Sequence, residues 1–244
     1  MSRISAILAT ALLLALCASV HAQWGPLEGL KIDKQEDLKD IPPVPAPQGA
    51  IVIFNGKDLN NWTDMGGKSP APWKVENGVL EVAPGKGNIL SKQMLEGDFK
   101  LHVEFRIPYL PNAHDQSRGN SGVYLQGRYE IQVLDAYHND TYKNGMCGAI
   151  YSVEAPSENV AKAPTVWQSY DIEFHSAKFE NGKKTEPVRI TVLWNGVKVH
   201  DNTKVDVNHT TAGMDTDPSK PGPLMLQDHG SPDQFRNIWM VPLK

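Results

Sequence analysis

Long hydrophobic runs are scarce in this sequence, which excludes a protein that crosses a membrane many times. The marked apolar run extends from Ile4 to Leu16, after the basic start Met1-Ser2-Arg3. It is too short to span a bilayer, so we predict no membrane span. Small residues follow as far as Ala22. The pattern therefore predicts a secretory signal peptide over residues 1–22, with cleavage near Ala22 and export to the periplasm or the medium.

Two alternatives remain for this N-terminal segment. An uncleaved membrane anchor would need a longer apolar run than the one present. A lipoprotein signal that ends at Cys17 is the second alternative. Such signals place a small residue where Leu16 stands here, so we rank the lipoprotein below simple export.

Cysteine is nearly absent, which excludes a framework of disulfides. The chain has 2 cysteines, and Cys17 leaves with the predicted signal peptide, so Cys147 has no partner for an intramolecular disulfide. An exported domain without disulfides depends on its hydrophobic core for stability. A lone cysteine without a paired base is typically a small buried apolar residue, and we interpret Cys147 in this way.

The sequence also lacks basic blocks. Its formal net charge is −4, and its positive and negative residues are mixed along the chain. A chain that binds nucleic acid or an anionic membrane surface is usually basic, at least in patches. We therefore expect no nucleic-acid partner.

Several catalytic motifs are missing. We find no glycine-rich phosphate loop, no Gly-x-Ser-x-Gly elbow and no close histidine pair of the zinc-protease kind. The Glu-x-Asp-x-x-Glu strand of laminarinase-like retaining glycosidases is also absent, because Gln132 stands at its middle position. Glu130 and Asp135 face opposite ways in a regular strand. This weakens a direct-displacement mechanism, which needs two carboxylates on one face.

The sequence does contain the pattern of antiparallel β-structure. Asn77-Gly78 and Asn195-Gly196 separate alternating runs, which is a strong signal of tight hairpins. Apolar and polar residues alternate from Asp98 to Ile107. This predicts an all-β, two-sheet antiparallel sandwich with long loops. Further strands are expected at residues 121–126, 128–135, 167–175, 187–194, 223–229 and 235–241.

A proline-rich segment precedes this domain. Ile41-Pro42-Pro43-Val44-Pro45-Ala46-Pro47 cannot enter a sheet interior, because proline has no amide donor. We predict a lead-in over residues 23–49, extended as a linker or as a strap over the surface. The globular domain is expected over residues 50–244.

Polar side chains gather on one face of two neighbouring predicted strands. An amide, a phenol, an acid and a second amide on one sheet face can bind the hydroxyl groups of a sugar. The alternative is an ordinary solvated sheet face. We expect Glu104 and Arg106 to join this face if their strand is adjacent. The residues on the two strands that carry the pattern are Asn120, Tyr124, Glu130 and Gln132.

Other candidates lie farther along the chain. Gln227 and His229 share a face at a strand end, where His229 is a base, a metal ligand or a loop anchor. Arg236 is a candidate partner for a carboxylate or a sugar oxygen. The long loop that carries His138, Asp140 and Tyr142 is expected to rim a pocket. Asp171, Glu173 and His175 share another face, which we interpret as solvated rather than metal-binding.

The motifs resemble a known family when they are taken in order. They are similar to the 3-keto-disaccharide hydrolase domain over roughly residues 50–242. The segments that carry the resemblance are 53–59 with Trp62, 73–80, 97–106, 120–124, 129–135, 147–151, 167–171 and 226–230. The resemblance implies a concanavalin-like jelly roll and an enzyme that cleaves glycosides oxidised at C3 of the sugar.

This substrate would explain why paired carboxylates are missing. A ketone at C3 acidifies the proton on C2, so that a base can remove it, the group on C1 leaves by β-elimination, and water adds to the enone. The route needs one base, one acid and donors or positive charge near the C3 oxygen. We assign Glu130 or His229 as the base and Arg106 as the stabiliser of the enediolate. A divalent metal ion held by Glu130, His229 and Glu104 is an alternative stabiliser.

The expected substrate-binding residues are Glu104, Asn120, Tyr124, Gln132, Asp135, Gln227 and Arg236. Two other functions remain open, a non-catalytic carbohydrate-binding module of the same fold and a hydrolase of unmodified glucans. The case for catalysis depends on Glu130, Gln132, Glu104, Arg106 and His229 lining one surface together. Neither the sugar nor the oligomeric state follows from the sequence.

Overall fold

The protein is described by a computed structural model that covers residues 27–243. The predicted signal peptide, with Cys17 and Ala22, lies outside the described residues. Within residues 27–243, no helix is long and apolar enough to cross a membrane.

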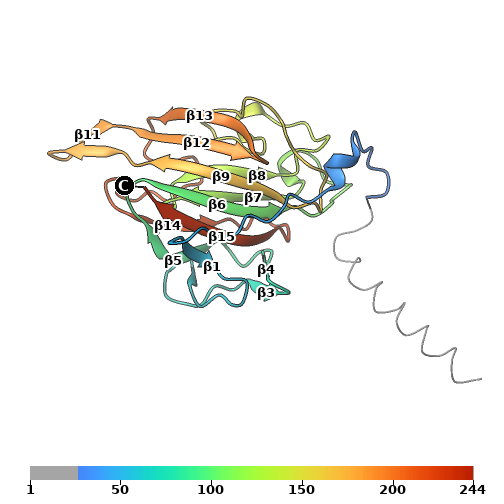
Figure 1. Ribbon diagram of the computed structural model, residues 1–244, viewed down its shortest axis with the longest axis horizontal. Coiled ribbons are helices and arrows are strands. Elements are labelled where there is room, and N and C mark those ends of the chain that lie inside the picture. The colour runs from blue at the N-terminus through green and yellow to red at the C-terminus, as the bar shows by residue number, and fades with distance from the viewer. Residues whose placement is uncertain (1–26, 244) are drawn as a thin grey trace, which may run out of the picture.

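Two antiparallel sheets pack face to face and form a jelly-roll sandwich (Figure 1). The predicted fold class is thus confirmed. The larger sheet has the strand order β13 (Val197–Val205), β12 (Val188–Trp194), β9 (Gln168–His175), β6 (Phe99–Arg106), β15 (Gln234–Pro242), β4 (Val79–Glu81) and β3 (Lys74–Glu76), with β1 (Ile51–Phe54) paired to β15. The smaller sheet has the order β2 (Trp62–Asp64), β5 (Ile89–Leu95), β14 (Gly222–Leu226), β7 (Asn120–Leu125) and β8 (Tyr129–Leu134).

The remaining elements are short. β10 (Lys178–Glu180) and β11 (Lys183–Glu186) form a separate hairpin that projects from one end of the sandwich (Figure 1). The helices in the described part of the chain are single 3-10 turns, η1 (Gln35–Leu38), η2 (Asp115–Ser117) and η3 (Lys143–Gly145). The long loops that carry η2 and η3 are important because they reach the site described below.

The two asparagine-glycine turns form the predicted hairpins. β3 and β4 meet at Asn77-Gly78, and β12 and β13 meet at Asn195-Gly196. Asn77 has φ 52° and Gly78 has φ 81°, so both turn residues are left-handed, as a two-residue hairpin turn requires.

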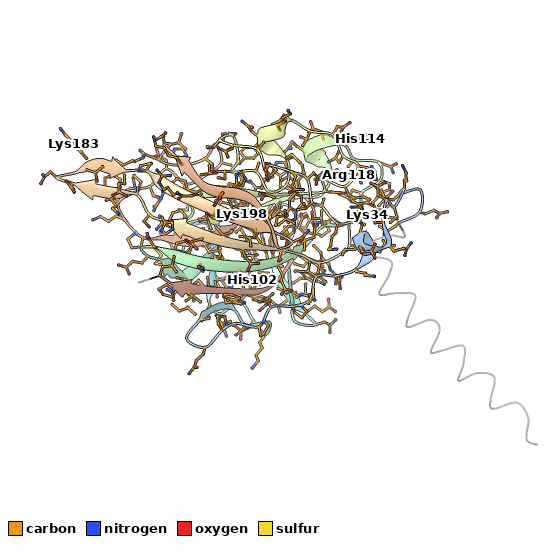
Figure 2. All side chains as sticks on the ribbon, turned by 45° about the horizontal axis from the view of Figure 1, so that its top comes forward. Lys34, His102, His114, Arg118, Lys183 and Lys198 are labelled. Carbon is orange, nitrogen blue, oxygen red and sulfur yellow. The ribbon has the colours of Figure 1, made fainter. Side chains whose placement is uncertain are left out.

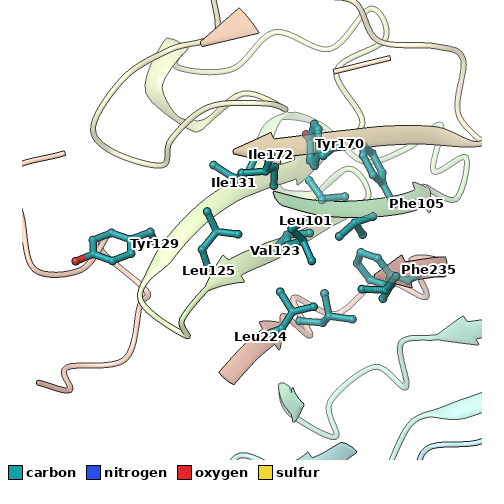
Figure 3. Close-up of a cluster of buried hydrophobic side chains, with 14 of the residues drawn as sticks. Leu101, Phe105, Val123, Leu125, Tyr129, Ile131, Tyr170, Ile172, Leu224 and Phe235 are labelled. Atoms are coloured by element: carbon teal, nitrogen blue, oxygen red, sulfur yellow. The ribbon is translucent and has the colours of Figure 1, made fainter. Parts of the chain in front are cut away.

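The core fills the space between the two sheets. One side comes from alternate residues of β6, such as Leu101 and Phe105, and the other from Val123, Leu125 and Ile131 of β7 and β8 (Figure 3). These side chains are at most 1% exposed. Because strand residues alternate, the polar partners of these residues point away from the core, on the outer face of each sheet. Cys147 is also buried, as predicted.

Residues 41–47, called the strap below, lie on the outer face of the larger sheet. The Val44 amide donates to Glu104 Oε1 on β6 at 3.1 Å, and the Val44 carbonyl accepts from Asn237 Nδ2 on β15 at 2.7 Å. Ile41 is bonded through its amide to the Trp167 carbonyl. In Figure 1 this blue segment passes along β6 and β15 before it enters β1. The strap therefore covers part of one outer face, whereas the smaller sheet has no such cover from it.

Candidate active site

Strands β7 and β8 place four of the predicted residues on one surface. In the antiparallel register Tyr124 lies opposite Glu130, and Gly122 lies opposite Gln132. Val123 and Ile131 point into the core, so these polar residues point to the outer face of the smaller sheet. Here a cavity of about 100 Å³ is lined by Gln116, Asn120, Glu130, Gln132, Tyr151, Thr211, Ala212, Gln227 and His229. This volume holds only several water molecules, so a sugar would reach Glu130 with one edge.

Glu130 lies at the buried end of this cavity. Glu130 is 2% exposed, and burial raises the pKa of its carboxyl to about 8. A hydrogen bond with Tyr124 lowers this pKa, but by less than burial raises it. Gly122 makes room for the carboxyl, because a Cβ at this position would lie 2.4 Å from Glu130 Oε1. The carboxyl is therefore mostly protonated at neutral pH, and it is a much stronger base than an ordinary carboxylate once it is ionised.

Tyr124 joins Glu130 to the end of β14. Gln227 Nε2 donates to the Tyr124 hydroxyl at 2.7 Å, which leaves the phenolic proton available to Glu130. Burial and the nearby Glu130 both raise the pKa of Tyr124, so the phenol stays protonated. The backbone of Gln227 is fixed by β7, since its amide donates to the Gly122 carbonyl at 3.1 Å and its carbonyl accepts from Ser121 Oγ at 2.6 Å.

Three amide side chains form one wall of the cavity. Gln132 Nε2 donates to Gln116 Oε1 at 3.0 Å and to the Gly145 carbonyl at 3.1 Å. Asn120 Nδ2 donates to the Gln116 carbonyl at 2.8 Å. The acceptors Asn120 Oδ1 and Gln132 Oε1 are buried and have no hydrogen-bond partner among residues 27–243. An unpaired buried acceptor costs about 1–3 kcal/mol, so these two oxygens suit a ligand that brings hydroxyl donors.

His229 lies at the rim of the cavity, on the loop after β14. Its side chain is exposed, and the loop on both sides of it is anchored. The Asp228 carboxylate accepts from the Gly87 amide at 2.8 Å and from the Gly230 amide at 3.0 Å. Ser231 Oγ accepts from the Asn120 amide at 2.9 Å. His229 is therefore held near the cavity mouth by a fixed loop, while its ring remains accessible.

The structure does not bring Glu104, Arg106 and Arg236 to this site. β6 and β15 belong to the larger sheet, and the three side chains lie on its outer face, beyond the core from Glu130. The expectation that Glu104 and Arg106 line one surface with Glu130 is thus wrong. The alternation of β6 was predicted correctly, but its neighbours are β9 and β15 rather than β7 or β8. Of the five groups on which the catalytic hypothesis depended, Glu130, Gln132 and His229 lie together.

Glu104, Arg106 and Arg236 instead form part of the surface under the strap. Arg236 Nε donates to Glu104 Oε2 at 2.6 Å, and Arg106 Nε donates to Gln234 Oε1 at 2.6 Å. Both guanidinium groups lie over the Trp167 ring, at 4.1 Å for Arg236 and 4.8 Å for Arg106. His102, labelled on β6 in Figure 2, stacks on Trp239 beside them.

Asp135 is also placed away from the cavity. Its carboxylate accepts from Arg118 Nε at 2.7 Å and from the Tyr137 amide at 3.1 Å. Burial raises the pKa of Asp135 to about 6, and Arg118 opposes this shift. The opposite orientation of Glu130 and Asp135 follows from their odd spacing, as predicted. Asp135 supports the loop that carries Arg118, labelled in Figure 2, and its predicted contact with substrate has no support in this geometry.

The hypothesis of a divalent cation held by Glu130, His229 and Glu104 fails in its third ligand, because Glu104 lies on the other sheet. Within residues 27–243, no three His, Cys, Asp or Glu side chains form a group that could hold a metal ion. The acidic row Asp171, Glu173 and His175 lies on the outer face of the larger sheet, where His175 bonds Glu173 and Asp98.

Other hollows are larger than this cavity. One of about 480 Å³ lies beside Asp33, Asp37 and Tyr137. Its polar groups are bonded to one another, since Tyr137 donates to Asp37 at 2.9 Å and His138 pairs with Asp33 at 3.1 Å. The smaller cavity is the better candidate because it combines a strongly shifted carboxyl with unpaired acceptors.

Sequence patterns missed four residues that line the site, which are Gln116, Tyr151, Thr211 and Ala212. Gln116 comes from the 3-10 turn η2, and Thr211 comes from a loop before β14. Neither position has a periodic pattern that would point to the site. Tyr151 ends the segment 147–151, which carries part of the family resemblance. That segment therefore points to Tyr151, although its strand pattern does not.

The family model of the 3-keto-alpha-glucoside-1,2-lyase-like domain matches residues 49–241. The chain belongs to this family. The predicted resemblance is confirmed, and membership in the lyase-like family identifies the chain as a carbohydrate-active enzyme whose substrate is a carbohydrate. No curated protein matches the chain.

The chain is also similar to three solved structures. A Parabacteroides distasonis protein described as a candidate glycosyl hydrolase is 36% identical, with a TM-score of 0.72 over 88% of this chain and 98% of its own. A second protein of the same description and organism is 20% identical, with a TM-score of 0.60 over 87% and 99% of the two chains. A third is 24% identical, with a TM-score of 0.53 over 80% and 99%. The second and third show the shared fold alone.

Proposed function

We propose that this enzyme cleaves 3-keto-glycosides, including 3-keto-disaccharides, by β-elimination and hydration at the cavity that contains Glu130. The observation that carries the proposal is one buried carboxyl with a pKa of about 8, placed beside two unpaired acceptors. A carboxylate of this basicity is suited to proton abstraction beside a ketone, because a catalytic base works best with a pKa near the operating pH. The family description, with its 3-keto-glucoside and its lyase step, supports the same chemistry.

The first step assigns a role to Glu130 and to His229. Glu130 removes the C2 proton, and the electrons of the C2–H bond form an enediolate with the C3 carbonyl. The bond from C1 to the leaving oxygen then breaks, a C1–C2 double bond forms, and His229 at the rim delivers a proton to that oxygen. Glu130 has no second carboxylate beside it in the cavity, and elimination does not require one.

The second step returns the sugar to its hydrated form. Water adds its hydroxyl to C1 of the enone and gives its remaining proton to His229, and the proton held by Glu130 returns to C2. The sum of both steps is hydrolysis, with no change in oxidation state. Asn120 Oδ1 and Gln132 Oε1 accept hydrogen bonds from sugar hydroxyls. Gln227, whose amide has a second N–H besides the one given to Tyr124, and Tyr151 are the donors proposed for the enediolate oxygen.

The test compares a glycoside before and after oxidation at C3. Trehalose and sucrose, and their 3-keto forms, are incubated with the enzyme, and released monosaccharide is measured. The proposal expects cleavage of the keto forms alone. Equal cleavage of both forms would support a hydrolase of unmodified glycosides, and binding without turnover would support a carbohydrate-binding module.

The pH dependence of kcat/KM tests the role of Glu130. As a base, Glu130 must be ionised, so kcat/KM should rise with pH through the pKa of about 8 in the free enzyme and level off above it. A fall through the same pH range would show that Glu130 acts as the acid and would reverse the two assigned roles.

Export is a separate part of the proposal. Residues 1–22 are proposed to direct export and to be removed near Ala22, which leaves Gln23 as the first residue. Mass spectrometry of the protein recovered from the periplasm or the medium gives the mature terminus. A lipid-modified Cys17 would replace this proposal with a lipoprotein.

A further inference from the structure

An exposed aromatic side chain stands beside the cavity and has no role in the elimination described above. Tyr142 is 49% exposed, although large aromatic side chains usually bury most of their surface. Its hydroxyl bonds the hydroxyl of Tyr151, which lines the cavity. The two rings meet edge to face, with centroids 6.3 Å apart.

The position of this ring is fixed by the same backbone that fixes the cavity wall. A Cβ on Gly145 would lie 2.1 Å from Tyr142 Cε2, so the ring packs directly on the backbone of Gly145. The Gly145 carbonyl accepts from Gln132 Nε2 at 3.1 Å and from Gln116 Nε2 at 2.9 Å. Tyr142 is thus held in a defined relation to the amide wall, and it is not a loosely attached surface residue.

The cavity is too small to hold a second sugar ring. A volume of about 100 Å³ admits one edge of the keto sugar beside Glu130. The other sugar of a disaccharide must then lie outside the mouth, where Tyr151 and Tyr142 follow one another. Sugar rings present C–H groups on their faces, and these pack well on the face of an aromatic ring that also keeps a polar hydroxyl at its edge.

We propose that Tyr142 and Tyr151 form a subsite for the leaving sugar, in which that sugar packs on the Tyr142 ring. The proposal rests on the function proposed above and adds a specificity: the enzyme prefers glycosides whose leaving group is a second sugar over those with a small alkyl group. Tyr142 contacts the leaving group and takes no part in the proton transfers.

The experiment measures binding in a Glu130→Gln background, which prevents turnover. The probes are 3-keto-trehalose, which has two rings, and methyl 3-keto-α-glucoside, which has one. Tyr142→Ala should weaken binding of the two-ring probe about tenfold and leave the one-ring probe unchanged. In the enzyme with Glu130 intact, the same change should raise KM for the two-ring probe with little effect on kcat.

Two control variants define the cause. Tyr142→Phe keeps the ring and loses the bond to Tyr151, so binding of both probes should stay near that of the unaltered residue. Met94→Ala removes a side chain of similar exposure, 45%, from β5 of the smaller sheet. This variant should bind both probes as the protein with the unaltered residue does.

Three outcomes would overturn the subsite. Equal weakening of both probes by Tyr142→Ala would show that the ring only shapes the cavity. Unchanged binding of both probes would show that no sugar reaches it. A loss in Tyr142→Phe as large as in Tyr142→Ala would assign the effect to the hydroxyl bond. Failure of the proposed reaction has a different signature, which is equal cleavage of trehalose and 3-keto-trehalose, and the comparison of probes remains informative in that case.

Discussion

Two buried glutamates on opposite faces of the sandwich differ in their surroundings, and the difference separates a reactive carboxyl from a structural one. Glu130 is 2% exposed and Glu104 is fully buried. Burial raises the pKa of Glu130 to about 8, with little to oppose it. Burial also acts on Glu104, but bonds from His102, Asn237, Arg236 and Val44 outweigh it and hold the pKa of Glu104 at about 2. Two carboxyls that are both shielded from solvent therefore have opposite chemistry, and the donors that surround Glu104 are a main cause of the difference.

The same contrast extends to the two faces as a whole. On the larger sheet, the strap supplies the Val44 amide to Glu104 and the Val44 carbonyl to Asn237 and Trp239. On the smaller sheet, Asn120 Oδ1 and Gln132 Oε1 are left unpaired. The chain thus completes the polar groups of one face from its own N-terminal segment and leaves those of the other for a ligand.

The largest expected effect is on catalysis. Glu130→Gln should lower kcat/KM on a 3-keto-glycoside by about 100- to 10,000-fold, because an amide cannot remove the C2 proton. The matched variant Glu104→Gln should keep kcat/KM within about threefold, since Glu104 lies on the other sheet. Thermal unfolding first shows that each variant is folded. Initial rates with both variants then give the two values of kcat/KM. Near-normal turnover by Glu130→Gln would remove the site assignment.

The next effect is the pH dependence of stability, which should have opposite sign at the two residues. The pKa of Glu130 is raised, so the unfolded chain loses a proton that the folded protein retains. Its contribution to the free energy of unfolding should therefore fall by on the order of 5 kcal/mol as pH rises from about 4.5 to about 8. The pKa of Glu104 is lowered. Its contribution is complete above about 4.5 and should be lost, on the order of 3 kcal/mol, as pH falls towards about 2.

Urea unfolding of the wild-type protein and each glutamine variant measures these contributions as differences. The free energy of unfolding of the wild type minus that of Glu130→Gln should fall between pH 5 and 8. This range lies between the pKa of the residue in the unfolded chain and its pKa in the folded protein. The free energy of unfolding of the wild type minus that of Glu104→Gln should increase as pH rises from 2 to 4.5. Parallel curves for the two variants would contradict the comparison, because they would mean that both carboxyls share one kind of environment.

The sequence could predict the local pattern of both faces, but not which strands become neighbours. Alternation placed Glu104 and Arg106 on the outer side of one strand and Glu130 and Gln132 on the outer side of another, and both orientations are correct. The pairing of β6 with β15 and β9 depends on contacts between residues far apart in the chain, and a period of two contains no information about them. The error at Glu104, Arg106 and Arg236 therefore came from topology.

Short edge elements and loop residues were missed for a different reason. β10 and β11 meet at Asn181-Gly182, a turn with φ 51° and 75°, but these strands of 3 and 4 residues are too short and too polar to stand out in the sequence. Gln116 enters the site from η2, and its role appears only when that turn is placed against Asn120 and Gln132. Site residues on strands were predictable from alternation, whereas Gln116 and Thr211 on loops were not.

A third effect concerns the stability contributed by the ion pair under the strap. Glu104→Gln at pH 7 should lower the free energy of unfolding by about 2–3 kcal/mol, because Arg236 and His102 lose a buried carboxylate partner. Glu130→Gln at the same pH should instead raise it by about 3 kcal/mol, because the unfolded wild-type chain releases at pH 7 a proton that the folded protein retains, and glutamine has no such proton to lose. Denaturant unfolding at pH 7 compares the two directly, and an equal loss in both would break the contrast.

The smallest effect tests whether the two faces are independent. Val44→Pro removes the amide that donates to Glu104 while keeping an extended backbone between Pro43 and Pro45. The change should cost about 1–2 kcal/mol of stability, and Val44→Ala, which keeps the amide, should cost less than half of that. Neither should alter kcat/KM by more than about twofold, because the core separates the strap from Glu130. A larger change in kcat/KM for Val44→Pro than for Val44→Ala would show that the strap controls the site through the sandwich, and the two faces would then have to be treated as one coupled system.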